Sequence, residues 1–86
     1  MTWRQMPRFY FHIEHDGNRL SDDEGSEVVN LEAARQAALR AAADITADDL
    51  RTGAERVSQR IVVANAVGEE VASVAVEAAV KVAGPR

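Results

Sequence analysis

The two histidines, His12 and His15, are the side chains of this sequence best suited to catalysis or metal binding. Imidazole binds metals and exchanges protons near neutral pH. Their spacing on a strand and turn points the rings in divergent directions, unlike a helical pair of metal ligands. The favoured interpretation is therefore an exposed strand histidine followed by a turn histidine. The alternative is a small metal-dependent enzyme in which His12 acts with Tyr10 and nearby carboxylates.

The acidic loop Asp22–Gly25 raises the question of calcium binding. An EF-type loop needs oxygen ligands at alternating positions, a central glycine and a terminal glutamate. Counted from Asp16, the third position holds Asn18, but the fifth holds Leu20, which has no side-chain oxygen. We therefore expect a solvated loop rather than a cation site.

Covalent catalysis has equally little support in the sequence. Ser58 and Ser73 have no neighbouring base, and the chain contains no cysteine, which excludes disulfides and thiol chemistry. The sequence thus predicts no catalytic residue, no metal site and no cofactor. Freedom from cysteine also agrees with a reducing cytoplasm.

The overall charge is −4, and acidic side chains crowd the region between Glu14 and Glu32. This balance argues against a nucleic-acid-binding surface, which needs basic side chains along the phosphates. Arg4 and Arg8 are not followed by the apolar core of a signal peptide, and no apolar run approaches the roughly 20 residues of a membrane span. We expect a cytoplasmic protein that binds neither nucleic acid nor membranes.

The first structural unit is a predicted hairpin. Residues Arg8–Glu14 alternate between two faces, as a half-buried strand does. The turn residues His15–Asn18 follow, and residues 21–26 are predicted to be loop. A register that pairs Glu14 with Arg19, and Ile13 with Leu20, matches charge on one face and apolar groups on the other. The face with Phe9, Phe11 and Ile13 is the predicted core face.

A helix is predicted from Asn30 to about Gly53. Asn30 is a good N-cap, Glu32 lies near the positive end of the helix dipole, and Gly53 is a typical stop. Leu39 and Leu50 lie on the flank of an apolar stripe. The stripe itself consists of Leu31, Ala34, Ala38, Ala41, Ala42 and Ile45.

A second hairpin follows the connector Ala54–Ser58. Its first strand, Arg60–Asn65, is apolar on both faces, and Gly68 marks the turn. The returning strand alternates from Val71 onward; its predicted register pairs Ile61 with Val74 and Val63 with Ala72. The end of this strand stays open, because Glu77–Ala83 also fits a helical turn.

These elements predict an α+β fold of order ββαββ, a four-stranded and mainly antiparallel sheet with one long helix on one face. Residues 1–86 are expected to form a single domain, with residues 1–5 and 84–86 as flexible tails unless Trp3 docks on an apolar face. Phe11 is predicted to be buried against the small side chains of Ala38–Ala42.

Several segments together resemble a family of small uncharacterised bacterial proteins, a domain of unknown function. The resemblance covers roughly Met6 to Val76. It rests on Met6-Pro7-Arg8-Phe9-Tyr10-Phe11-His12, Asp16-Gly17, Asp22-Asp23-Glu24-Gly25, Leu31-Glu32-Ala33-Ala34-Arg35 and the turn glycine Gly68. It implies a bacterial cytosolic setting and supplies no activity. The chain departs from the pattern in the five residues before Met6 and in its Ala/Val-rich end. A fainter topological similarity to HicB-type antitoxins implies, as an alternative, an antitoxin-like regulator.

A sheet with one helix leaves one face uncovered, and this predicts an interaction surface. Its residues are expected to be Tyr10, His12, Val62, Ala64, Val71 and Ala75. A chain this small has a marginal core, and association with a second copy is a common remedy. We therefore expect a non-enzymatic protein-interaction module that forms a homodimer through this face or through the last strand, with an unidentified protein as a further possible partner. The alternative is that the C-terminal segment covers the face.

Overall fold

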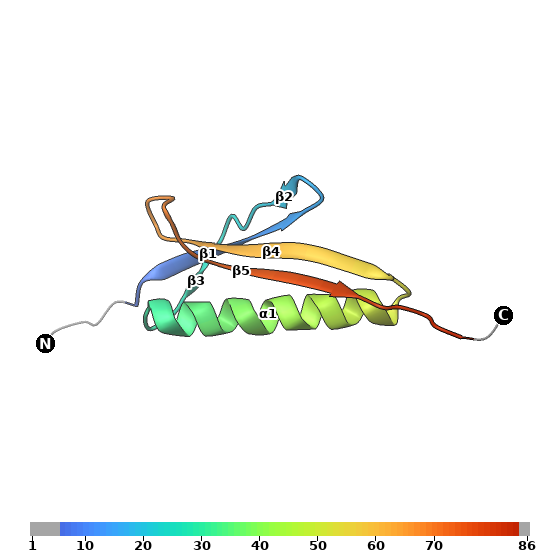
Figure 1. The fold of residues 1–86 in the computed structure, drawn as a ribbon. Coiled ribbons are helices and arrows are strands. Elements are labelled where there is room, and N and C mark those ends of the chain that lie inside the picture. Colours follow the sequence, from blue (N-terminus) through green and yellow to red (C-terminus); the bar gives the residue numbers. More distant parts are fainter. Residues whose placement is uncertain (1–5, 85–86) are drawn as a thin grey trace, which may run out of the picture.

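The computed structural model describes residues 6–84 and confirms the α+β class, with one helix packed along an antiparallel sheet (Figure 1). The elements, in chain order, are β1 (Arg8–His15), β2 (Asn18–Leu20), β3 (Ser26–Glu27), α1 (Leu31–Arg51), β4 (Arg56–Ala64) and β5 (Glu70–Ala79). The expectation for residues 1–5, including Trp3, lies outside the described residues. The predicted ββαββ order is present, with one short addition, β3.

The strands are arranged in the order β2-β1-β4-β5, and β3 also pairs with β1. Every pairing is antiparallel. β2 pairs with Ile13–His15 and β3 with Arg8–Phe9, so these two short strands lie along the same edge of β1. The prediction of loop at Ser26 was wrong, because β3 is too short and too polar to show a strand pattern.

The register of the first hairpin is as predicted, with Ile13 opposite Leu20 and Glu14 opposite Arg19. The turn itself is tighter, because His15 still pairs with Asn18. Asp16 and Gly17 connect the strands with φ angles of 52° and 77°. Two consecutive positive φ angles characterise the type I′ turn, whose twist matches that of paired strands.

Helix α1 begins as predicted at the N-cap Asn30, whose Oδ1 accepts a hydrogen bond from the backbone N–H of Ala33 at 2.8 Å. It ends at Arg51, and Gly53 follows with a φ of 103°. The buried stripe is narrower than predicted and consists of Ala34, Ala38 and Ala42. Leu31, predicted in the stripe, is 39% exposed, whereas Ile45 is partly buried against the core cluster.

The second hairpin has the predicted register, with Ile61 opposite Val74 and Val63 opposite Ala72. Strand β4, however, begins at Arg56 rather than at Arg60. Polar Gln59 hid this longer strand in the sequence. It points into the core, where its Nε2 donates to Asp49 Oδ2 of α1 at 3.2 Å.

The end of β5 shows whether the residues after Val76 form strand or a helical turn. β5 continues through Ala79, so Glu77 to Ala79 is strand and not a helical turn. Residues 80–84 follow without regular secondary structure. In Figure 1 this part of the chain runs beyond the end of α1.

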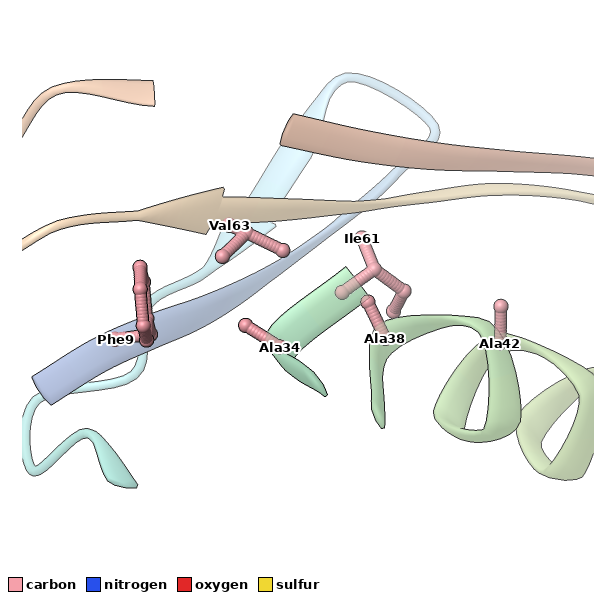
Figure 2. Packing of buried hydrophobic residues seen from close by; sticks show 6 residues of the cluster. All are labelled: Phe9, Ala34, Ala38, Ala42, Ile61 and Val63. Atoms are coloured by element: carbon pink, nitrogen blue, oxygen red, sulfur yellow. The ribbon is translucent and has the colours of Figure 1, made fainter. Parts of the chain in front are cut away.

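The core lies between α1 and the strands β4 and β5, against which the helix packs. Figure 2 shows its central side chains: Phe9, Ala34, Ala38, Ala42, Ile61 and Val63. Phe9 is the buried aromatic ring, 6% exposed, whereas Phe11 is only half-buried at the border of the cluster. The prediction for Phe11 was therefore wrong. Along its length β1 moves away from α1 towards the edge of the sheet where β2 lies (Figure 1).

Candidate interaction surface

The outer face of the sheet, opposite α1, carries a network of four charged side chains, Glu14, Arg19, Arg60 and Glu70. Arg19 Nε donates to Glu14 Oε2 at 3.0 Å, and one nitrogen of each arginine lies 3.4 Å from a carboxylate oxygen of Glu70. The hydrogen bond from Arg19 lowers the pKa of Glu14, and the charges of Arg19 and Arg60 act in the same direction. The network therefore connects β2 to β5 across the two strands between them.

The structure corrects the predicted open face of the sheet. Val62 and Ala64 are 0% and 3% exposed, so the expectation that both face water was wrong. Val62 lies between Arg60 and Ala64 on β4, and Ala64 pairs with Glu70. Val62 and Ala64 are thus buried within the single chain, beside the half-buried His12 and Tyr10 of β1.

Val71 also departs from the predicted surface, because it packs against the core cluster. The register shifts here: Val63 pairs with Ala72, whereas Ala64 pairs with Glu70. Val71 is the extra residue of a β-bulge, and a bulge redirects side chains relative to simple alternation. Of the other predicted surface residues, Tyr10 and His12 are half-buried and Ala75 is exposed.

The two histidines have separate backbone partners. His12 Nδ1 accepts a hydrogen bond from the N–H of Asp22 at 3.0 Å, which leaves the ring proton of neutral His12 on Nε2. His15 Nδ1 lies 3.0 Å from the carbonyl oxygen of Ser58, and its Nε2 lies 3.1 Å from Asp16 Oδ2. Within residues 6–84, no group of three or more histidine, cysteine or acidic side chains is placed to hold a metal ion.

An open depression of about 420 Å³ lies beside the turn between β1 and β2. Its lining includes His15 and the charged side chains Glu14, Arg19 and Arg60. These groups already bind one another or, for His15, the backbone of Ser58. Glu14, His15, Arg19 and Arg60 are therefore already engaged within the fold.

Asp22 is the important polar residue that sequence reasoning missed. Its Oδ2 accepts the backbone N–H of Phe11 at 3.0 Å, and its Oδ1 accepts those of Glu24 and Gly25 at 3.2 Å and 3.0 Å. The bond from Phe11, together with those from Gly25 and Glu24, lowers the pKa of Asp22. An aspartate three residues before a glycine is a known pattern for such loop bonds. Asp22 fills the gap between β2 and β3 on the edge of β1.

The opposite edge of the sheet is formed by β5, and within residues 6–84 no strand pairs with its outer side. The N–H of Val80 bonds the carbonyl oxygen of Glu55 at 2.8 Å, so the even-numbered residues direct their backbone groups towards β4. The odd-numbered residues direct theirs outward, and all four are exposed: Ser73, Ala75, Glu77 and Ala79. Glu77 is the one charged residue between Val71 and Ala79. Strand edges usually carry more protection than this.

Comparison with family models gives one match, a domain of unknown function (DUF6894) over residues 8–77. The chain belongs to this family. The match runs from the first residue of β1 into β5, and it agrees with the resemblance seen in the sequence. No curated protein and no solved structure matches this DUF6894 chain. Within residues 6–84, α1 lacks the apolar character that a membrane-crossing helix requires.

Proposed function

We propose that this DUF6894 protein is a small, non-enzymatic protein-interaction module that self-associates by strand addition at the free edge of β5. A bacterial cytoplasmic setting belongs to the same proposal; it is supported by the sequence resemblance and by the absence of cysteine. The polar groups considered as possible sites serve the fold itself. The histidines bind backbone, the outer-face charges bind one another, and Asp22 binds the edge of β1.

The observation that carries the proposal is the contrast between the two sheet edges. On β1, the outer edge is occupied by β2, Asp22 and β3. On β5, the odd-numbered residues from Ser73 to Ala79 direct their N–H and C=O groups outward, and Glu77 is the single charged residue of the strand after Glu70. Unpaired backbone groups on a regular strand are a template for another strand. A second copy brings the same edge, and a two-fold axis satisfies both at once.

The test compares two lysine substitutions that change the net charge equally. Ala75→Lys places like charges at the free edge, and we expect it to give monomers, whereas wild type should be dimeric at tens of micromolar. Ala47→Lys lies on an exposed position of α1 and should stay dimeric. Sedimentation velocity measures the assembly, and circular dichroism checks the fold. A monomeric wild type, or an Ala75→Lys variant as dimeric as wild type, would refute the proposal.

A further inference from the structure

The segment that follows β5 has the character of a contact arm. Val80 makes the last backbone bond to the rest of the chain, to Glu55, and is still 49% exposed. Val82 is 92% exposed. Lys81 lies between them and is the single lysine of the sequence. Two exposed valines flanking a cation point to a partner surface with both apolar and acidic character.

The register of a β5 pair follows from which residues face outward. In a two-fold antiparallel pair that continues the sheet, one residue lies opposite itself at the axis. An axis at Ala75 places each Glu77 opposite Ser73 of the partner subunit, whose hydroxyl is able to donate to the carboxylate. An axis at Glu77 opposes two carboxylates, and an axis at Val74 sets Glu77 against Val71 of the partner subunit. An axis at Ala79 pairs Glu77 with Lys81 of the partner subunit but engages only the end of β5. Ala75 is therefore the favoured centre.

Counting outward from Ala75 brings the arm to an acidic site. Lys81 is six residues beyond the axis. On the other side, Val71 is the extra residue of the bulge, so Glu69 of the partner subunit is five strand positions from the axis and lies beside the position across from Lys81. Glu69 lies in the turn before β5 and Glu70 is the first residue of β5, and both are exposed. Within the chain, Asn65 Nδ2 donates to Glu69 Oε1 at 2.8 Å, and Glu70 belongs to the charged network of the outer face. By the two-fold symmetry, the contact between Lys81 of one copy and the acidic turn of the other occurs at both ends of the dimer. The arm and the acidic turn are thus complementary in charge and in position.

We propose that residues 80–83 of one copy lie along the turn between β4 and β5 of a second copy, with Lys81 paired to Glu69 or Glu70 of the partner subunit. This inference rests on the proposed self-association through β5 and adds its register and its second contact. The dimer is then a continuous sheet centred on Ala75, with an ion pair between Lys81 and Glu69 or Glu70 of the partner subunit at each end (the charged clasp).

Cysteine cross-linking tests the register, and the cysteine-free chain gives a clean background. Directly opposed residues of a hydrogen-bonded antiparallel pair have Cα atoms about 5.5 Å apart, within the range of a disulfide. We expect Ala75→Cys to form a covalent dimer under a mild oxidant. Ser73→Cys and Glu77→Cys alone should not, since each residue would lie about 14 Å from its own copy. An equimolar mixture of the latter two variants should cross-link.

Charge reversal tests the clasp in the same dimer. Lys81→Glu should raise the dimer dissociation constant by about 3- to 10-fold, and Lys81→Glu combined with Glu69→Lys should recover most of that loss. Salt should weaken the wild type more than Lys81→Glu. A wild-type dimer without the Ala75→Cys cross-link, or one unaffected by Lys81→Glu, would overturn this inference and leave edge pairing standing. A monomeric wild type would overturn both proposals.

Discussion

Asp22 takes the place of a missing strand residue beside Phe11. Its Oδ2 accepts the backbone N–H of Phe11 at 3.0 Å, at the point where neither β2 nor β3 reaches β1. The same carboxylate accepts two loop N–H groups, and its own N–H bonds His12. One side chain thus closes both the edge of the strand and the loop that crosses it.

Replacing Asp22 should destabilise the fold measurably. Asp22→Ala leaves the N–H of Phe11 without its acceptor and opens the loop, and we expect a loss of about 2–4 kcal/mol in the free energy of unfolding. Asp23→Ala is the matched control, because Asp23 is exposed and adjacent. Urea unfolding followed by circular dichroism gives both values. Equal losses for the two variants would show that the hydrogen bonds of Asp22 contribute nothing specific.

The stability contributed by Asp22 should depend on pH. Its pKa in the folded protein is held below the ordinary value of 3.8, chiefly by the N–H of Phe11. A carboxyl group with a lowered folded-state pKa stabilises the fold fully above its unfolded pKa, and this stabilisation is lost as the pH falls through the folded pKa. The difference in unfolding free energy between wild type and Asp22→Asn should therefore shrink between about pH 5 and pH 2. Urea titrations at each pH measure it, and a difference that stays constant would contradict the assignment.

The two rings of β1 should differ in their contribution to stability. Phe9→Ala removes a ring that is 6% exposed and should lower the unfolding free energy by about 3–5 kcal/mol. Phe11→Ala removes a ring that is only half-buried at the border of the core cluster, and its effect should be clearly smaller. Because Phe9→Ala is expected to leave little stability, Phe9→Leu provides a second, milder variant for comparison with Phe11→Leu. Chemical denaturation of all four variants ranks their losses in unfolding free energy. A larger loss at Phe11 than at Phe9 would contradict the assignment of Phe9 as the central core ring.

Gly25 is required for a reason that Gly68 does not share. Both have positive φ angles, 70° and 87°. A Cβ at Gly25 would lie 2.8 Å from Tyr10 Cε2 and 3.0 Å from the carbonyl oxygen of Phe9, whereas a Cβ at Gly68 meets no atom within 4 Å. Gly68→Ala should cost about 1 kcal/mol from backbone strain alone, and Gly25→Ala should cost more. Thermal unfolding of the two variants separates the steric clash from the backbone strain.

Local patterns made most of the fold predictable. The register of both hairpins and the N-cap at Asn30 follow from residues close together in sequence, and the structure confirms them. The errors arise where distant residues decide the outcome. Gln59 is accepted in the core because Asp49 of α1 accepts its hydrogen bond. Val62 is buried on β4, where its paired neighbours are His12 of β1 and Ser73 of β5.

The candidate surface was harder to predict than the fold. The alternation of β5 suggested an associating strand, but a sequence does not show which side of a strand stays unpaired. The bulge turns Val71 towards the core, whereas strict alternation along the strand would place it on the outer face. Nothing in the local sequence marks the position of this bulge. Asp22 was missed for a related reason, since its main partner is the N–H of Phe11, 11 residues away.

The short strands beside Asp22 also determine how many copies can join. A chain with two free edges of equal quality would keep adding copies and grow into filaments. Here one edge ends in strands of three and two residues, joined by a loop that Asp22 holds in place. Growth from that side has too little continuous strand to begin. In the proposed assembly, pairing through β5 would therefore stop at two copies, because the edge beyond β1 offers no strand long enough to continue the sheet.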